Sequence, residues 1–305
     1  MNILSAHQID KQYGTVKVLD QLTVDVPLGS IYGLLGPNGA GKTTFIRIAN
    51  RITAPDRGEL FFMGHKMRYS DTAKIGYLPE ERGLYRKMKT GEQALYLAGL
   101  KGLSKTDARK RTAEWFERFE ITGWWNKKVE ELSKGMQQKL QFIITVLHDP
   151  SLLILDEPFS GFDPVNAELM KKEIRRLRDK GTTVILSTHN MSSVEEMCDH
   201  ISLIDNSRCI LHGNVSQIRQ AYKSGEYELG FEGDAKLLEE VLDAYQCSVD
   251  WDAEHPGKAR ICAPEKAANK LLSIIISCVS VTSFNEILPS MHDIFIRNVK
   301  KTPRL

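Results

Sequence analysis

The chain has 305 residues with 41 basic and 39 acidic side chains, and its net charge of +2 lacks the basic surplus typical of general nucleic-acid-binding proteins. Hydrophobic residues make up 42% and charged residues 26%, as in ordinary globular proteins, and no apolar run reaches the roughly 20 residues of a membrane span. The five cysteines are odd in number and none has C-x-x-C spacing, so neither a disulfide framework nor a cysteine-based metal or redox site is indicated.

Short strands are expected first along the chain. Residues 3–26 are predicted to form two or three antiparallel strands, because Leu22, Val24 and Val26 alternate with polar neighbours. Residues 57–64 predict another short strand that ends at Gly64. Between these stretches, Ile31–Leu35 is an apolar run of strand length, and residues 44–50 are predicted to begin a helix.

The segment between that strand and that helix reads Gly-Pro-Asn-Gly-Ala-Gly-Lys-Thr-Thr and fits the phosphate-binding loop G-x-x-x-x-G-K-[ST]. Its glycines allow main-chain N–H groups to approach phosphate oxygens, and the following helix N-terminus favours negative charge. Lys42 would reach the β- and γ-phosphates of ATP, and the Thr43 hydroxyl would bind Mg²⁺. The predicted nucleotide-binding residues here are Gly36, Pro37, Asn38, Gly39, Ala40, Gly41, Lys42, Thr43 and Thr44.

The middle of the chain is helical and is followed by buried strands. Helical spacing runs from Thr90 to about Gly123, with Thr106 as the expected N-cap of one helix. Three β-branched apolar runs then alternate with helix-like segments, which predicts a parallel sheet. The runs are residues 152–155, 183–187 and 201–204, and the helix-like segments are residues 165–180 and 192–197.

Two carboxylates, Asp156 and Glu157, directly follow the first of these buried strands. An Asp at the C-terminal end of a strand beside a phosphate loop can hold Mg²⁺. The next carboxylate points elsewhere and can polarise an attacking water. We therefore expect Asp156 as a metal ligand and Glu157 as the catalytic base.

Further motifs resemble those of the ABC-type ATPases. Leu132 to Lys139 reads LSKGMQQK and resembles that family's LSGGQ signature, with Ser133 and Gly135 kept at the phosphate-facing positions. The order of phosphate loop, signature and acidic strand is the family's order. His189 stands where the family carries its switch histidine, and Tyr13 where it stacks an aromatic ring on adenine. The resemblance covers roughly residues 1–222 and implies an α/β P-loop NTPase fold with an antiparallel β subdomain and a helical subdomain.

The resemblance also implies a head-to-tail dimer with two ATP molecules between the subunits, so that the phosphate loop of one faces Ser133 and Gly135 of the other. A homodimer and a heterodimer with a close relative both remain possible. Lys134 and Met136 replace the usual Gly and Gln of the signature. Glu80 stands where the family has a Gln that touches Mg²⁺ and the attacking water, so we expect Glu80 to take part in catalysis and metal binding, with altered hydrolysis.

Residues 223–305 are expected to form a separate C-terminal domain with the order βαββαβ, a small ferredoxin-like α+β fold. Its helices are predicted over residues 236–245, 265–276 and 291–300. Together with Glu80, this tail resembles that of ATPase subunits of bacterial ABC-2-type exporters. The sequence does not decide whether it regulates, dimerises or braces the protein.

The sequence therefore predicts an ATP-hydrolysing subunit that powers export through a separate transmembrane permease. Such a subunit would be cytoplasmic, peripheral on the inner face of the membrane, and would bind no nucleic acid. The permease would dock near residues 80–85 and 90–125, where Trp124 and Trp125 contribute either to docking or to local core packing. The alternative is a non-transport ABC ATPase that acts on the ribosome or on nucleic acid.

Overall fold

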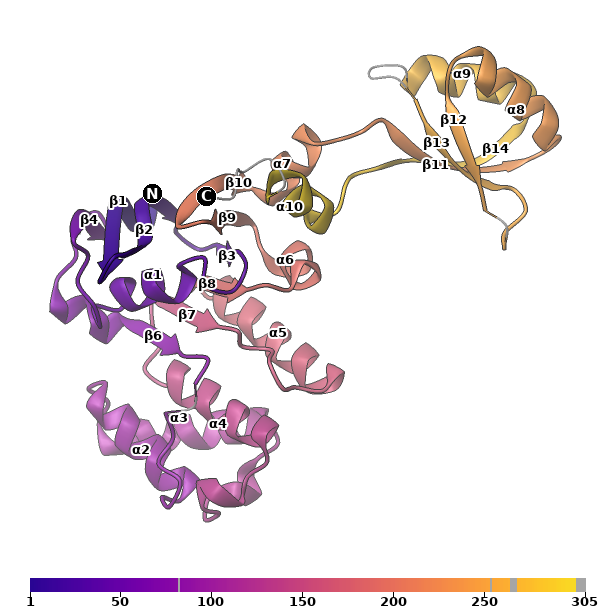
Figure 1. Cartoon of the computed structure of the whole chain (residues 1–305). Coiled ribbons are helices and arrows are strands. Elements are labelled where there is room, and N and C mark those ends of the chain that lie inside the picture. Colours follow the sequence, from indigo (N-terminus) through magenta and orange to yellow (C-terminus); the bar gives the residue numbers. More distant parts are fainter. Residues whose placement is uncertain (82, 253, 264–267, 300–305) are drawn as a thin grey trace. The chain divides into compact units, whose positions relative to one another are not determined.

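The computed structural model describes residues 1–81, 83–252, 254–263 and 268–299. The chain divides into two compact units, one comprising Met1–Val215 with Asn298 and Val299, the other Ser216–Arg297 (Figure 1). The domain boundary expected between residues 222 and 223 stays a prediction. No helix in the described ranges combines the length and the apolar character that crossing a membrane requires.

An antiparallel sheet with the order β2-β1-β4-β5 opens the N-terminal unit. Residues 3–26 were expected to hold two or three short strands, but they belong to two long strands joined by a tight turn at Gly14, where φ is +58°. Buried and exposed residues alternate as predicted from Leu22 to Val26, and β-bulges interrupt the register without ending the strands. The strands are β1 (Asn2–Tyr13), β2 (Val16–Pro27), β4 (Arg57–Phe62) and β5 (His65–Lys66).

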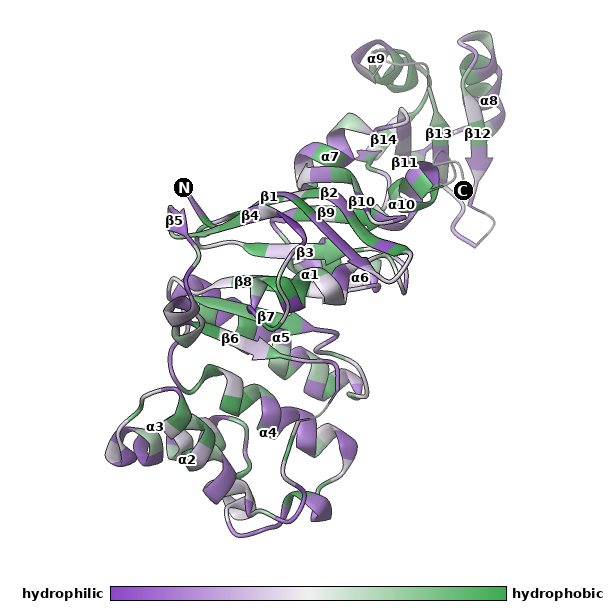
Figure 2. Cartoon of the chain, turned by 60° about the vertical axis from the view of Figure 1, so that its left-hand side comes forward, coloured by the Kyte–Doolittle hydropathy of each residue, from purple (hydrophilic) through white to green (hydrophobic). Residues whose placement is uncertain are grey.

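The second sheet of this unit has six strands in the order β10-β9-β3-β8-β7-β6. All neighbouring pairs are parallel except the edge pair β10–β9, so the predicted parallel sheet is confirmed. Its central strands are largely green in Figure 2, as expected for strands buried on both faces. The strands are β3 (Ile31–Leu35), β6 (Ile75–Leu78), β7 (Leu152–Asp156), β8 (Thr183–Thr188), β9 (His200–Asp205) and β10 (Arg208–Asn214).

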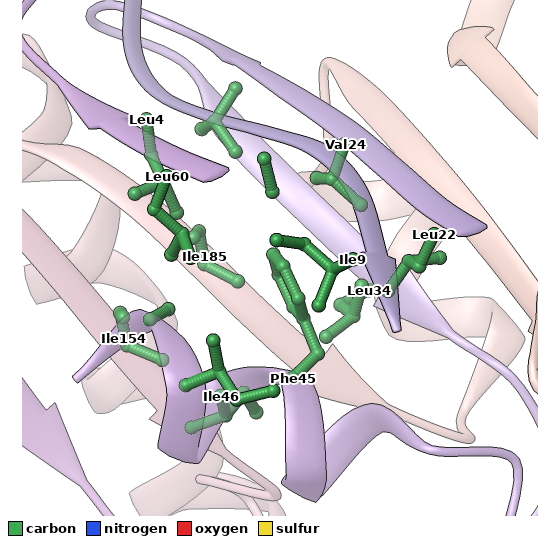
Figure 3. Packing of buried hydrophobic residues seen from close by; sticks show 14 of the residues in the cluster. Leu4, Ile9, Leu22, Val24, Leu34, Phe45, Ile46, Leu60, Ile154 and Ile185 are labelled. Carbon is green, nitrogen blue, oxygen red and sulfur yellow. The ribbon is translucent and has the colours of Figure 1, made fainter. Parts of the chain in front are cut away.

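The main core lies between the two sheets and is filled by α1 (Lys42–Ala49). Phe45 and Ile46 on α1 point toward apolar side chains from both sheets, as Figure 3 shows for Ile9 and Leu34. Phe45 is fully buried. The helix that follows the phosphate loop is therefore fixed by packing over its whole length, and this fixes the loop as well.

Three helices, α2 (Thr90–Leu100), α3 (Lys105–Arg118) and α4 (Lys134–Val146), form the helical part of the unit. The predicted N-cap Thr106 is wrong. Ser104 caps α3, because its hydroxyl accepts the N–H of Asp107 at 3.1 Å. Ser104 precedes Thr106 in the same polar stretch and is an equally suitable N-cap residue. Further helices are α5 (Pro164–Asp179) and α6 (Met191–Met197), close to the predicted segments.

The C-terminal unit is a four-stranded antiparallel sheet with the order β12-β13-β11-β14. Helices α8 and α9 contribute Leu238, Leu242, Leu271 and Ile275 to its own core. The βαββαβ order matches the predicted one, although residues 265–267 of one predicted helix and Lys300 of another lie outside the described residues. The elements from the junction onward are α7 (Val215–Ala221), β11 (Glu226–Glu232), α8 (Ala235–Ala244), β12 (Ser248–Trp251), β13 (Lys258–Cys262), α9 (Ala268–Cys278), β14 (Ser280–Ile287) and α10 (Met291–Val299).

Candidate functional site

A cavity of about 330 Å³ lies in the N-terminal unit at the carboxyl ends of its parallel strands. Open α/β sheets bind ligands at this edge. The cavity brings together residues from the loop before α1, from the ends of β6, β7 and β8, and from β2. They are Val18, Asn38, Gly39, Gly41, Lys42, Thr43, Thr44, Glu80, Asp156, Glu157 and His189.

The phosphate loop connects β3 to α1 and depends on positive φ angles at three glycines. Gly36, Gly39 and Gly41 have φ values of +148°, +82° and +112°. A Cβ at Gly36 would stand 2.1 Å from the carbonyl oxygen of Ile204, so this glycine is also needed for close packing on β9. Because Gly41 is the N-cap of α1, the free N–H groups of the first helical turn face the cavity edge where an anion is favoured.

Lys42 folds back over its own loop. Its ammonium group donates to the carbonyl oxygens of Gly36, at 2.7 Å, and Pro37, at 3.0 Å. Burial lowers the pKa of Lys42, while the carboxylates of Glu157, Asp156 and Glu80 act in the opposite direction. A phosphate group would supply the negative charge that a buried ammonium group needs.

Thr43 and Asp156 supply the oxygen donors of the site. The Thr43 hydroxyl lies 3.4 Å from Oδ2 of Asp156, and burial raises the pKa of the Asp156 carboxyl. Hydroxyl and carboxylate oxygens are ligands that suit Mg²⁺. Within the described part of the chain, no group of three or more His, Cys, Asp or Glu side chains could hold a metal ion. A bound Mg²⁺ would therefore complete its shell with phosphate and water, as Mg²⁺ usually does.

Glu157 turns away from Asp156 because its backbone is left-handed, with φ at +47°. Its Oε1 accepts the main-chain N–H of His189 at 3.0 Å and lies 2.6 Å from Nδ1 of the same residue. Its Oε2 accepts from the Thr188 hydroxyl at 3.1 Å. The side chain of Glu157 is 15% exposed, whereas that of His189 is 66% exposed. A half-buried carboxylate beside an accessible imidazole can exchange protons with a bound ligand.

Three residues assigned from the family resemblance are not among the residues that line this cavity. Tyr13 ends β1, is 48% exposed, and has the Lys11 ammonium 5.4 Å from its ring centre. Ser133 is the N-cap of α4 and accepts the N–H of Met136 at 3.3 Å, and Gly135 lies in the first turn of that helix. The signature residues thus form the N-terminus of α4, but that helix end does not belong to the cavity of its own chain.

Two contributors were missed in the sequence. Val18, on β2, lines the cavity, and Thr188 bonds to Glu157. No pattern marks Val18, because its alternation with neighbours is that of any strand residue. Thr188 directly precedes His189 at the end of a buried strand, and this position in the sequence could have indicated that Thr188 lies near the site.

Comparison with known proteins agrees with this geometry. Residues 19–160 match the family model described as ABC transporter, and residues 213–299 match the model described as the C-terminal domain of DrrA1-3-like ATP-binding proteins. The chain is 39% identical over 297 residues to the uncharacterized ABC transporter ATP-binding protein YhaQ of Bacillus subtilis (strain 168), covering 97% of this chain and 98% of that protein.

A second relative is the daunorubicin/doxorubicin resistance ATP-binding protein DrrA of Streptomyces peucetius, 31% identical over 301 residues, with 94% of this chain and 89% of that protein covered. Among solved structures, the ATP-binding subunit of an ABC transporter superposes with a TM-score of 0.67 at 30% identity, covering 72% of this chain and 93% of that one. The likeness therefore extends over both units of the chain for the two relatives and over the ATP-binding fold for the structure.

Proposed function

Since this chain belongs to the ABC transporter ATP-binding family, whose members hydrolyse ATP, we propose that it powers export through a separate transmembrane permease. The observation that carries the proposal is the cavity that joins Lys42, Thr43, Asp156, Glu157 and His189 from three separate segments. The full-length likeness to a drug-resistance ATP-binding protein supports export as the direction of transport. We assign the ATP-binding role to residues 1–222 and an accessory role to residues 223–305.

In this proposal Lys42 and the loop N–H groups bind the phosphates of ATP. Thr43 and Asp156 would hold Mg²⁺, with Glu80 at the same cavity, and the ion would neutralise charge on the phosphates. Glu157 takes a proton from water as the water oxygen bonds to the γ-phosphorus. The bond from that phosphorus to the bridging oxygen breaks, and its electron pair leaves with ADP. His189 orients Glu157 through the contacts to Oε1.

The position of the α4 N-terminus supports a dimer. Ser133 caps a helix and Gly135 lies in its first turn, where N–H groups can bind phosphate, yet neither residue lines the cavity of its own chain. A second subunit that supplies this helix end completes the site of the first. Tyr13 would contact the adenine from the open end of β1, where its exposed ring is available.

A groove beside Glu80 supports the permease as a partner. It has a volume of about 360 Å³ and is lined by apolar side chains of the β6–α2 connection, α2 and α4, among them Leu84, Leu97, Leu100 and Ile144. Exposed apolar grooves of this kind mark interaction sites. Trp125 is less suited to docking, because it packs over Gly91 and Phe116 inside the helical region. A subunit held in this way would lie on the cytoplasmic face of the membrane.

The proposal is tested with a tagged Glu157→Gln chain expressed in its host and purified from detergent-solubilised membranes with ATP. We expect ATP hydrolysis to fall by about 10²- to 10⁴-fold, and a dimer that persists with bound ATP on size exclusion. A multi-span permease encoded with the chain should co-purify, and its removal should abolish drug-like substrate export by the cells. Hydrolysis at the parental rate, or recovery of ribosomes or nucleic acid in place of a membrane protein, would refute the proposal.

A further inference from the structure

The carboxylate of Glu157 has unequal oxygens. Each carboxylate oxygen can accept about two hydrogen bonds. Oε1 uses both positions on His189, one for the main-chain N–H at 3.0 Å and one for Nδ1 at 2.6 Å. Oε2 accepts one bond, from the Thr188 hydroxyl at 3.1 Å. Oε2 is therefore the oxygen that retains a free acceptor position for the proton of a water molecule.

The hydroxyl of Thr188 is held in one direction. It has a single proton, and its oxygen accepts the N–H of Asn190 at 3.1 Å. With that acceptor position occupied by a main-chain donor, the proton is directed to Glu157. Thr188 is 2% exposed and pairs with Leu35 of β3 in the parallel sheet, so its backbone is fixed as well. A β-branched side chain in a strand has few rotamers, which adds to the rigidity.

We propose that Thr188 is a positioning residue for ATP hydrolysis, because its hydroxyl holds the Glu157 oxygen that receives the water proton. The inference rests on the proposed role of Glu157 as the base. A glutamate side chain has three rotatable bonds, and His189 alone anchors only one of the two oxygens. The second anchor stops rotation of the carboxylate about its last bond and keeps the free acceptor position of Oε2 in place.

The test compares three variants of the full chain. Thr188→Val removes the hydroxyl at nearly constant shape, and Thr188→Ser restores it. Thr183→Val is the matched control, because Thr183 lies on the same strand, is fully buried, and also accepts a main-chain N–H, that of Gly29 at 2.8 Å. Both valine variants lose a buried hydroxyl that serves a backbone donor, but only one of them loses a bond to Glu157.

We expect Thr188→Val to lower kcat for ATP hydrolysis by about ten- to a hundredfold, the range for a misplaced reacting group. Its affinity for a fluorescent ATP analogue and its KM should change less than twofold, about the precision of the measurement. Thr188→Ser should regain most of the parental kcat, and Thr183→Val should keep it. A crystal structure of Thr188→Val should show the Glu157 carboxylate rotated or in two conformers.

A parental kcat in Thr188→Val would overturn the proposal. The same follows if Thr183→Val loses as much activity, if KM rises with kcat unchanged, or if Glu157 keeps its conformer in the crystal. Thr188→Ala is the second variant, and the same outcomes apply to it if the valine chain does not fold. Glu157→Gln separates the proposed role of Glu157 from the proposed role of Thr188. If Glu157→Gln hydrolyses ATP at the parental rate, Glu157 is not the base, whatever Thr188 does.

Discussion

Alanine at Gly36 should destabilise the N-terminal unit far more than alanine at Gly39, although both glycines belong to the same loop. Both have positive φ, so each substitution incurs backbone strain of about 1–3 kcal/mol. At Gly39 no atom lies within 4 Å of the added Cβ. At Gly36 the Cβ meets the carbonyl oxygen of Ile204 at 2.1 Å. That oxygen belongs to β9, which is paired on both sides and cannot move without breaking the sheet.

The clash at Gly36 should add at least about 2 kcal/mol to the strain, as overpacking in a rigid core does. The free energy of unfolding would be measured by urea denaturation followed by tryptophan fluorescence. Trp251→Phe in both chains removes the tryptophan of the C-terminal unit, so that the signal comes from Trp115, Trp124 and Trp125 of the N-terminal unit. Equal losses for the two variants would show that Ile204 yields to the added methyl group and would refute the packing argument.

Three other predictions concern the site and its surroundings. Lys42→Ala should weaken ATP binding by about ten- to a hundredfold through loss of charge-assisted hydrogen bonds, and unchanged binding of a fluorescent ATP analogue would contradict it. Glu80→Gln introduces a side chain that can donate a hydrogen bond as well as accept one, so the ATPase rate of the variant should differ from that of the parent. The prediction is contradicted if variant and parent have equal rates both alone and with the permease. Burial lowers the pKa of His148 to about 4, so between pH 4 and about 6.5 the unfolded chain binds more protons than the folded chain. The stability contributed by neutral His148 is therefore complete above about pH 6.5 and is lost as the pH falls through this range. The free energy of unfolding, measured by urea denaturation, should therefore fall between pH 7.5 and pH 5 by about 2 kcal/mol more for the parent than for His148→Gln. An equal fall for the two chains would contradict the pKa shift.

The sequence predicts those parts of the fold that local patterns determine. The phosphate loop, the strand before Asp156 and the helices around it are marked by short motifs or by long periodic segments, and the structure has them. Three strands were missed, and one of them, β5, has only two residues. β6 has only four residues, including Gly76, and β10 is an antiparallel edge strand in which half-buried and exposed residues mix. Their places depend on the neighbouring strands β7 and β9 rather than on their own pattern.

The site itself could be predicted as a set of residues but not as a set of contacts. The end of a buried strand predicted Asp156 and Glu157, and the family resemblance predicted His189. All three line the cavity, because β7 and β8 are parallel and end at the same edge of the sheet. The bond from Thr188 to Glu157 crosses 31 positions of the chain and depends on the rotamer of each side chain. Val18 lines the cavity only because β2 passes beside the loop, and neither relation leaves a periodic signal.

The left-handed backbone of Glu157 connects the stability of the site to its chemistry. For a residue other than glycine this conformation costs about 1–2 kcal/mol, and such strain persists only where the surroundings impose it. Here the N–H of Glu157 continues the β7–β8 pairing by donating to Ser187 at 2.9 Å, while the carboxylate is anchored on the next two residues, Thr188 and His189. The C-terminal end of β8 and the residue after it thus hold both the main-chain N–H and the carboxylate of Glu157, and these hydrogen bonds offset its strain. Relaxing the backbone would free the carboxylate from these anchors, so the strained conformation is what places the proposed base in the cavity of the phosphate loop.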